Sequence, residues 1–253
     1  MNIQYASDLH LEMPANAQWI QKNPIKPKAD TLVLAGDIYP FGDDYADNPF
    51  WDYVSKNFKR TIVIPGNHEL YGHFDINKLR GGSVKAVRDN VHLVYNKVIH
   101  LDEKTDLIAS TLWSHIPEET AVAVQACVND FNRIRDGAEN LTSERFNKEF
   151  KRCLNFVKRS LKNSKAKNKI VVTHHVPSND LIVPVYRGSL LSGAFVTDLD
   201  KVIKDLKPNY WIYGHSHGNI DKKIGSTQCL SNQLGYVQGE NISSFSTEKV
   251  LKI

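Results

Sequence analysis

Five short polar clusters hold the residues best suited to chemistry, and each cluster follows a short β-like run. Asp8 and His10 come directly after residues 2–7 and place a carboxylate and an imidazole two positions apart at a strand end. That pair is half of a metal site, so the remaining donors are expected from other strand ends. Four later clusters supply them: Asp37 after residues 31–35, Asn67 and His68 after 61–64, His174 and His175 after 169–172, and His215 and His217 after 210–213.

The donors in these clusters predict a site for two metal ions. Seven ligands are too many for one ion but suit two ions that share a carboxylate, whose oxygens can face both. Carboxylate, amide and imidazole donors together suit divalent Mn, Fe or Zn. Paired ions about 3.5–4 Å apart clamp the attacking and leaving oxygens of a phosphate ester and lower the pKa of bound water. The candidate ligands are Asp8, His10, Asp37, Asn67, His174, His215 and His217.

A glycine precedes the donors in three of the clusters, at Gly36, Gly66 and Gly214. Glycine permits sharp turns from strand to loop and allows other groups to approach the backbone closely. We therefore expect both features at these three positions.

The elements between the clusters are predicted in the order strand–helix–strand, followed by a run of short strands. The apolar run 31–35 is typical of a strand covered on both faces. Further strands are predicted at 91–95, 98–101 and 106–112, with antiparallel strands in 228–253. Helices are predicted at 15–22, 48–58, 117–128, 142–161 and 196–206, with a turn-rich link at 130–137. Another helix, at 75–89, would be capped by Asp75, although Gly81 and Gly82 interrupt its middle.

Length and composition predict one soluble domain, residues 1–253, with 41% hydrophobic and 24% charged residues. The formal net charge of +4 mildly favours anionic partners and does not argue for a nucleic-acid groove. Cys127, Cys153 and Cys229 lie far apart without a C-x-x-C pair, which predicts buried free thiols in a reducing compartment. Signal-peptide features and apolar windows of about 18 residues are missing, so we expect a cytoplasmic protein without a membrane partner.

Taken together, the clusters resemble the five-part signature of the calcineurin-like metallophosphoesterases. The matching motifs are Asp8-Leu9-His10, Gly36-Asp37, Gly66-Asn67-His68-Glu69, His174 and Gly214-His215-Ser216-His217. They span residues 8–217, and the segment 173–178 is more similar to small bacterial phosphohydrolases than to eukaryotic protein phosphatases. The resemblance implies an α/β fold, a four-layer α/β/β/α sandwich of two mixed β-sheets flanked by helices, with the site at strand ends.

The resemblance also implies how the site residues divide their roles. One ion would be held by Asp8, His10, Asp37 and His217, and the other by Asp37, Asn67, His174 and His215. His68 would not be a ligand; it would contact the phosphate and protonate the leaving oxygen, since the pKa of histidine lies near working pH. His174 is preferred over His175 as the ligand because it leaves the strand first.

The sequence departs from the familiar pattern after Asp37. Many family members continue Gly-Asp-x-x-Asp, and the last Asp orients the histidine of the Asn-His pair, but Pro40 stands there in this chain. The orienting carboxylate is therefore missing or supplied elsewhere. Asp43 and Asp44 are nearby candidates, or else plain loop acids.

Other residues could shape a substrate pocket. Asn67 and His68 are expected to contact the phosphate. Three loop arginines, Arg133, Arg135 and Arg187, either grip it or are ordinary surface charges. Four aromatic residues, Tyr39, Tyr71, Phe74 and Trp113, either stack on a substrate ring or pack in the core.

The sequence thus predicts a metal-dependent phosphoric ester hydrolase, a phosphatase or phosphodiesterase acting on a small ester such as a nucleotide. Hydroxide bridging the two ions would attack phosphorus in line while His68 assists the leaving group. The alternative is a catalytically silent metal-binding scaffold of the same fold that acts through protein contacts. Such a chain should show substitutions among its donors or at His68, and the sequence has none.

Overall fold

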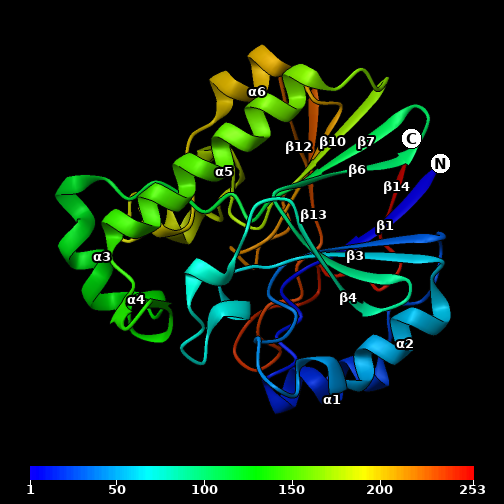
Figure 1. Cartoon of the computed structure of the whole chain (residues 1–253), viewed down its shortest axis with the longest axis horizontal. Coiled ribbons are helices and arrows are strands. Elements are labelled where there is room, and N and C mark those ends of the chain that lie inside the picture. Colours follow the sequence, from blue (N-terminus) through cyan, green and yellow to red (C-terminus); the bar gives the residue numbers. More distant parts are fainter.

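Two six-stranded β-sheets lie face to face, with helices on both outer faces (Figure 1). The computed structural model describes residues 1–253 apart from the side chain of Val185. The first sheet has the order β14 (Val250–Lys252), β1 (Asn2–Ala6), β2 (Thr31–Ala35), β3 (Arg60–Ile64), β5 (Val91–Tyr95) and β4 (Ser83–Arg88). The second has the order β12 (Lys222–Ile224), β13 (Thr227–Ser231), β11 (Tyr210–Tyr213), β10 (Asn168–Val172), β7 (Thr105–Ala109) and β6 (Lys97–Asp102).

Helices α1 (Pro14–Lys22) and α2 (Pro49–Asn57) cover the first sheet, and α5 (Ser143–Asn163) and α6 (Asp200–Leu206) cover the second. The Asn48 and Thr142 side chains cap α2 and α5 by accepting hydrogen bonds from the backbone N–H groups of Phe50 and Arg145. The predicted four-layer arrangement of two mixed sheets flanked by helices is therefore confirmed.

Strand β2 is apolar throughout because both of its faces are buried. Its Val33 and Ala35 side chains pack between the two sheets, whereas Leu32 and Leu34 pack against the helix layer that contains α1 and α2. Because both faces are covered, neither can be polar.

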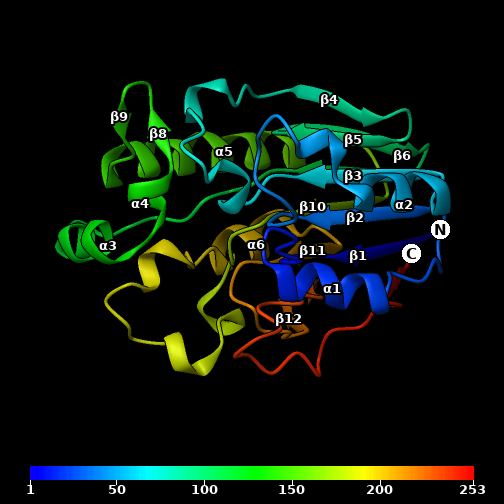
Figure 2. The same ribbon diagram turned by 90° about the horizontal axis from the view of Figure 1, so that it is seen from below.

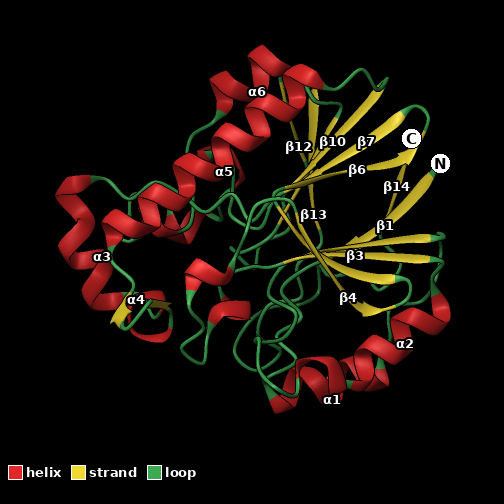
Figure 3. Ribbon diagram, in the orientation of Figure 1, coloured by secondary structure: helices red, strands yellow, loops and turns green.

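In each sheet the central strands are parallel and the edge strands antiparallel. Strands β1, β2, β3 and β5 run parallel in the first sheet, and β7, β10, β11 and β13 in the second. Their carboxyl ends lead into loops, green in Figure 3, that gather at one side of the sandwich, away from the two termini. That side is where ligands bind in sheets of this kind.

Two connecting regions lie outside the four layers. Helices α3 (Ala121–Cys127) and α4 (Asp130–Arg133) stand at one end of the molecule, beside the ribbon of β8 (Arg135–Asp136) and β9 (Glu139–Asn140) (Figure 2). The segment 179–196 forms a loop with short 3₁₀ turns at the same end. Among the described residues, none of the helices combines the length and apolar character that a bilayer crossing requires.

Several sequence predictions about local structure are wrong. Residues 75–89 contain one 3₁₀ turn, Ile76–Lys78, capped by Asp75, and then β4, which pairs with β5. The helix predicted at 196–206 begins only at Asp200, because Val196 and Thr197 pair with Val176 as extended chain.

Three further corrections concern the link, the tail and the cysteines. The predicted link 130–137 contains α4. Strand β13 in the tail runs parallel to β11, although β12 and β14 are antiparallel to their partners. Cys127, at the end of α3, is exposed, whereas Cys153 and Cys229 are buried free thiols as predicted.

Candidate metal centre

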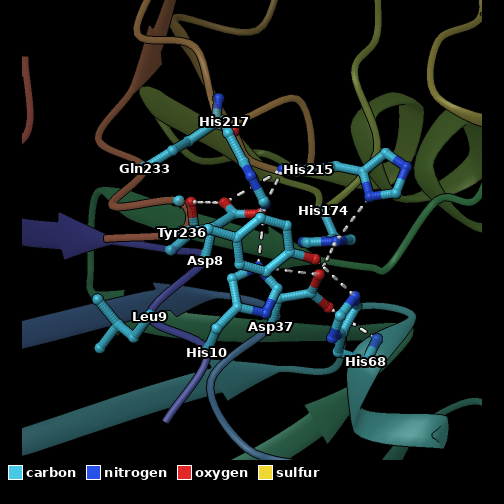
Figure 4. A network of polar contacts seen from close by, with 12 residues as sticks. Asp8, Leu9, His10, Asp37, His68, His174, His215, His217, Gln233 and Tyr236 are labelled. Carbon is cyan, nitrogen blue, oxygen red and sulfur yellow. Dashed lines mark hydrogen bonds and ion pairs between the residues drawn. The ribbon is translucent and has the colours of Figure 1, made fainter. Parts of the chain in front are cut away.

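Six of the seven predicted ligands lie together at the carboxyl ends of the parallel strands (Figure 4), and the seventh, Asn67, contacts His174. Strands β1, β2 and β3 of the first sheet lead into Asp8, His10, Asp37 and Asn67, and β10 and β11 of the second lead into His174, His215 and His217. All are buried except His217, whose side chain is 14% exposed. The site therefore lies where the loops of the two sheets meet.

The first donor group consists of Asp8, His10 and His217. The Nε2 atoms of His10 and His217 lie 3.0 Å apart, and His217 Nε2 lies 3.6 Å from Asp8 Oδ1. Asp8 is fixed by the backbone N–H of His215 and by the hydroxyl of Ser7, both of which donate to its carboxylate. The group thus presents one oxygen and two nitrogens to a common point.

The second donor group consists of Asp37, His174 and His215, with Asn67 beside it. His174 Nε2 lies 3.3 Å from Asp37 Oδ2, 3.1 Å from His215 Nδ1 and 3.1 Å from Asn67 Oδ1. Asp37 Oδ2 also lies 3.9 Å from His10 Nε2 in the first group. The Asp37 carboxylate therefore stands between the two groups.

The ring nitrogens that face outward from the groups all lie on hydrogen-bond acceptors. His10 Nδ1 and His217 Nδ1 contact the carboxylates of Glu12 and Glu240, and His174 Nδ1 and His215 Nε2 contact the carbonyl oxygens of Ala35 and Ala194. These acceptors place the ring protons on the outward nitrogens. The inward nitrogens then face each other with lone pairs at 3.0 and 3.1 Å, an arrangement that a cation between them would stabilise. The donor sets fit divalent metal ions.

Five of the predicted ligands have backbone angles in the left-handed region. Their φ values are +55° for Asp8, +45° for His10, +55° for Asp37, +77° for His215 and +51° for His217. Residues other than glycine rarely adopt such angles, and the strain concentrates at functional sites. The folded chain therefore holds these side chains inward at a cost in backbone energy.

Gly36 and Gly66 make room for the second donor group. A Cβ atom on Gly36 would lie 2.5 Å from His174 Nδ1, and Gly36 also has a φ of +91°. A Cβ atom on Gly66 would lie 2.1 Å from Asp37 Oδ1. The close approach predicted at these glycines is present.

Glu69 fixes the turns that carry Asp37 and Asn67. Its fully buried carboxylate accepts hydrogen bonds from the backbone N–H groups of Asp37, Ile38 and Gly66, at 2.8, 2.8 and 2.6 Å. Burial and the nearby Asp37 raise the pKa of Glu69, and the backbone donors oppose that rise. The sequence motif contained Glu69, but its role follows only from these contacts.

His68 lies beside both donor groups and turns its two nitrogens in different directions. Its Nδ1 lies 2.8 Å from Glu12 Oε1, and its Nε2 lies 3.4 Å from the Tyr236 hydroxyl. Burial alone would lower the pKa of His68, but the Asp37 and Glu12 carboxylates outweigh it and raise the pKa to about 9. His68 can therefore hold a proton on the nitrogen that faces the pocket.

His175 is placed differently from His174. Its ring packs between Trp113, Phe146 and His215, and neither of its nitrogens has a hydrogen-bond partner. Burial and the nearby His174 hold the pKa of His175 well below its usual range. His175 is thus a neutral packing residue, and His174 is the histidine of this pair that joins the second donor group.

Two pockets flank His68. One of about 260 Å³ opens onto the second donor group and is bounded by α3, α4 and the segment 179–196, with Tyr186 and Phe195 on its wall. The other, of about 440 Å³, contains Glu12, Tyr39 and Arg133. Both share Tyr71 and Tyr236.

The other candidate substrate contacts are scattered. Arg133 lies over the Tyr71 ring, while Arg135 bonds to Asn140 and Arg187 lines a separate pocket of about 390 Å³. Trp113 is fully buried in the core, and the partly buried Phe74 packs against the core and against Phe41.

Comparison with known proteins places the chain among the phosphoesterases. The sequence model of the calcineurin-like phosphoesterases matches residues 1–219. The chain belongs to this family. An uncharacterized protein, L509, of Acanthamoeba polyphaga mimivirus is 30% identical to it, over 94% of this chain and 92% of that protein.

A solved structure supports the same fold. The phosphopantetheinyl hydrolase of Mycobacterium tuberculosis superposes with a TM-score of 0.67 at 17% identity, over 93% of this chain and 89% of that one. At that identity the likeness concerns the fold alone. Calcineurin-like phosphoesterases typically use divalent metals, and the two donor groups of this member fit them.

In this phosphoesterase the Asn67 amide is oriented by a residue of α4. Asp130 Oδ1 accepts hydrogen bonds from Asn67 Nδ2 at 2.9 Å and from the Tyr71 hydroxyl at 2.7 Å. The contact turns Asn67 Oδ1 toward His174. Asp130 is 1% exposed, and burial raises its pKa.

Replacing Asp130 by Ala should therefore weaken binding of a metal ion at the second donor group. The freed amide would rotate, and loss of such an outer contact typically costs about 10- to 100-fold in metal affinity. Titration of the metal-free protein with Mn²⁺ measures this. The control is Tyr71→Phe, which keeps the Asn67–Asp130 bond and should cost less. Equal affinities in Asp130→Ala and the unaltered protein would contradict the assignment.

Four polar residues of the site were missed by sequence reasoning. They are Glu12 on His68, Asp130 on Asn67, Glu240 on His217 and Tyr236 near His68. Glu12 follows His10 by two positions in the same loop, and that proximity is the one signal that could have found it. Asp43 and Asp44 do not contact His68; Asp44 accepts a hydrogen bond from Tyr39.

Proposed function

We propose that this phosphoesterase binds two divalent metal ions, of Mn, Fe or Zn, and hydrolyses a small phosphomonoester or phosphodiester. One ion would be held by Asp8, His10, Asp37 and His217, and the other by Asp37, Asn67, His174 and His215. The observation that carries the proposal is the presence of two pairs of facing imidazole nitrogens, 3.0 Å apart in the first donor group and 3.1 Å apart in the second, with Asp37 between the two groups.

The chemistry divides between the ions and the chain. When bound, paired divalent ions offset the charge of the phosphate oxygens and lower the pKa of a bound water. His68 holds a proton at Nε2, facing the pocket, and gives it to the leaving oxygen as the bond from phosphorus to that oxygen breaks. Asp37, Glu69 and the Gly66 turn keep the donors in place.

The substrate would enter through the pocket of about 260 Å³ beside His68. Asn67 and His68 would contact the phosphate, and Arg133 in the adjoining pocket could reach a second anionic group. Tyr186 lines both the entry pocket and the one that contains Arg187. Arg187 would therefore contact only a substrate long enough to pass Tyr186.

The test is hydrolysis of an aryl phosphomonoester and an aryl phosphodiester by metal-free protein to which Mn²⁺, Fe²⁺ or Zn²⁺ is added. We expect turnover of at least one ester to depend on metal and to saturate near two ions per chain by elemental analysis. The proposal fails if neither ester is hydrolysed with any metal. Binding of only one ion per chain would contradict the proposed mechanism with two ions.

A further inference from the structure

The carboxylate of Glu12 joins two histidines with different expected roles. Its Oε1 lies 3.2 Å from His10 Nδ1 and 2.8 Å from His68 Nδ1. The shorter of the two contacts is the one to His68, which is not among the proposed ligands.

Of the two ways in which the His68 ring could be turned, only one keeps all of its contacts with neighbouring residues. Its ring packs against Tyr71 at a centroid distance of 4.1 Å and meets the edge of His10 at 4.4 Å. Its backbone N–H donates to Asp37 Oδ1. With Nδ1 on Glu12, Nε2 faces Tyr236 and the entry pocket (Figure 4). A ring turned over by 180° would lose the Glu12 contact.

The other nearby carboxylates are engaged elsewhere. Asp37 Oδ1 accepts the backbone N–H of His68 and Asp37 Oδ2 faces the two donor groups. Asp130 binds Asn67 and Tyr71. Position 40, where the resemblance places an orienting acid, is a proline. Glu12 is thus the carboxylate that bonds to the His68 ring.

We propose that Glu12 is the positioning residue for His68, supplied by the loop after β1 and not by the loop after β2. Glu12 keeps the hydrogen on Nδ1, so the proton that leaves comes from Nε2 and passes to the departing oxygen. A carboxylate at this position holds the ring in the productive tautomer and orientation. This inference rests on the proposed function, in which His68 is the acid.

The test compares two carboxylates that each hold a histidine of the first donor group. Glu12 contacts the rings of His10 and His68, whereas Glu240 contacts the ring of one histidine, His217, at 2.9 Å. Glu240 also accepts a hydrogen bond from the backbone N–H of Tyr236. Glu12→Ala and Glu240→Ala are assayed as Mn²⁺-loaded proteins on a series of aryl and alkyl phosphates whose leaving groups differ in pKa. If either alanine variant does not fold, Glu12→Gln and Glu240→Gln replace them.

We expect the loss of kcat in Glu12→Ala to be about 100-fold or more greater on poor leaving groups than on the best one, because a good leaving group needs no proton. Glu240→Ala should lose the same factor on every ester. In a His68→Ala background, Glu12→Ala should add no further dependence on the leaving group, because the two residues act as one unit.

Uniform losses in Glu12→Ala, matching those in Glu240→Ala, would overturn the inference and leave Glu12 as a support of His10 alone. A third ion per chain that disappears in Glu12→Ala would also overturn it, by making Glu12 a ligand. If the unaltered protein is inactive on all of these esters, the proposed function itself is wrong. If His68→Ala loses the same factor on every ester, His68 is not the acid. An inactive unaltered protein and this result for His68→Ala both count against the proposed function, whereas uniform losses in Glu12→Ala alone count only against the role of Glu12.

Discussion

Replacing Asp37 by Asn is expected to lower kcat/KM for an aryl phosphate by about a thousandfold, roughly 4 kcal/mol of transition-state stabilisation. Asp37 Oδ2 lies 3.3 Å from His174 Nε2 and 3.9 Å from His10 Nε2, so one charged oxygen serves both donor groups. An amide has the same size but no charge, and the positive charge of two ions would be poorly balanced. The measurement is steady-state hydrolysis at saturating Mn²⁺, with the metal content determined on the same sample.

The matched control is Asp43→Asn, which makes the same chemical change six residues later on an exposed loop. It should keep full activity and metal content. Asp37→Asn should stay folded because Asn replaces Asp without a change in volume, and its thermal unfolding is compared with that of the control. If Asp37→Asn retained more than about a tenth of the activity, Asp37 would not be shared between ions. If the unaltered protein were also inactive, the scaffold alternative would gain support.

The residues of the metal centre could be predicted because each signal is local. A run such as residues 31–35 predicts a buried strand from its own composition, and the polar residue after it must lie at the end of that strand. Parallel order among the central strands then brings Asp8, Asp37 and His174 to one side. The resemblance supplied the two-sheet architecture, which periodicity alone could not.

The contacts that orient the ligands could not be predicted, because they join distant parts of the chain. Asp130 reaches Asn67 across 63 positions and Glu240 reaches His217 across 23. Nothing in the local sequence of Asp130 distinguishes it from a loop acid. The helix predicted at 75–89 failed for a similar reason, since pairing of β4 with β5 outweighs the local pattern.

Replacing Gly66 by Ala is the second change with a large expected effect. An ideal Cβ atom there would lie 2.1 Å from Asp37 Oδ1 and 2.7 Å from the His174 Nε2 and Cε1 atoms. These neighbours cannot withdraw without loss, because Asp37 and His174 are both buried and held by hydrogen bonds. We expect a destabilisation of about 1–3 kcal/mol, typical of overpacking, together with loss of a metal ion at the second donor group.

The control for Gly66→Ala is Gly81→Ala, where the nearest atoms to a new Cβ lie at 3.5 and 3.7 Å, an ordinary contact distance. Neither position has a glycine-type φ, so the pair separates the effect of space from that of backbone strain. Chemical denaturation and Mn²⁺ titration of both variants measure the two effects. A Gly66→Ala protein that bound two ions with unchanged affinity would show that the turn can move outward. The short distance between Gly66 and Asp37 would then not be needed for metal binding. The hydrogen bonds of Glu69 to the backbone of Asp37, Ile38 and Gly66 would be enough to hold the donors in place.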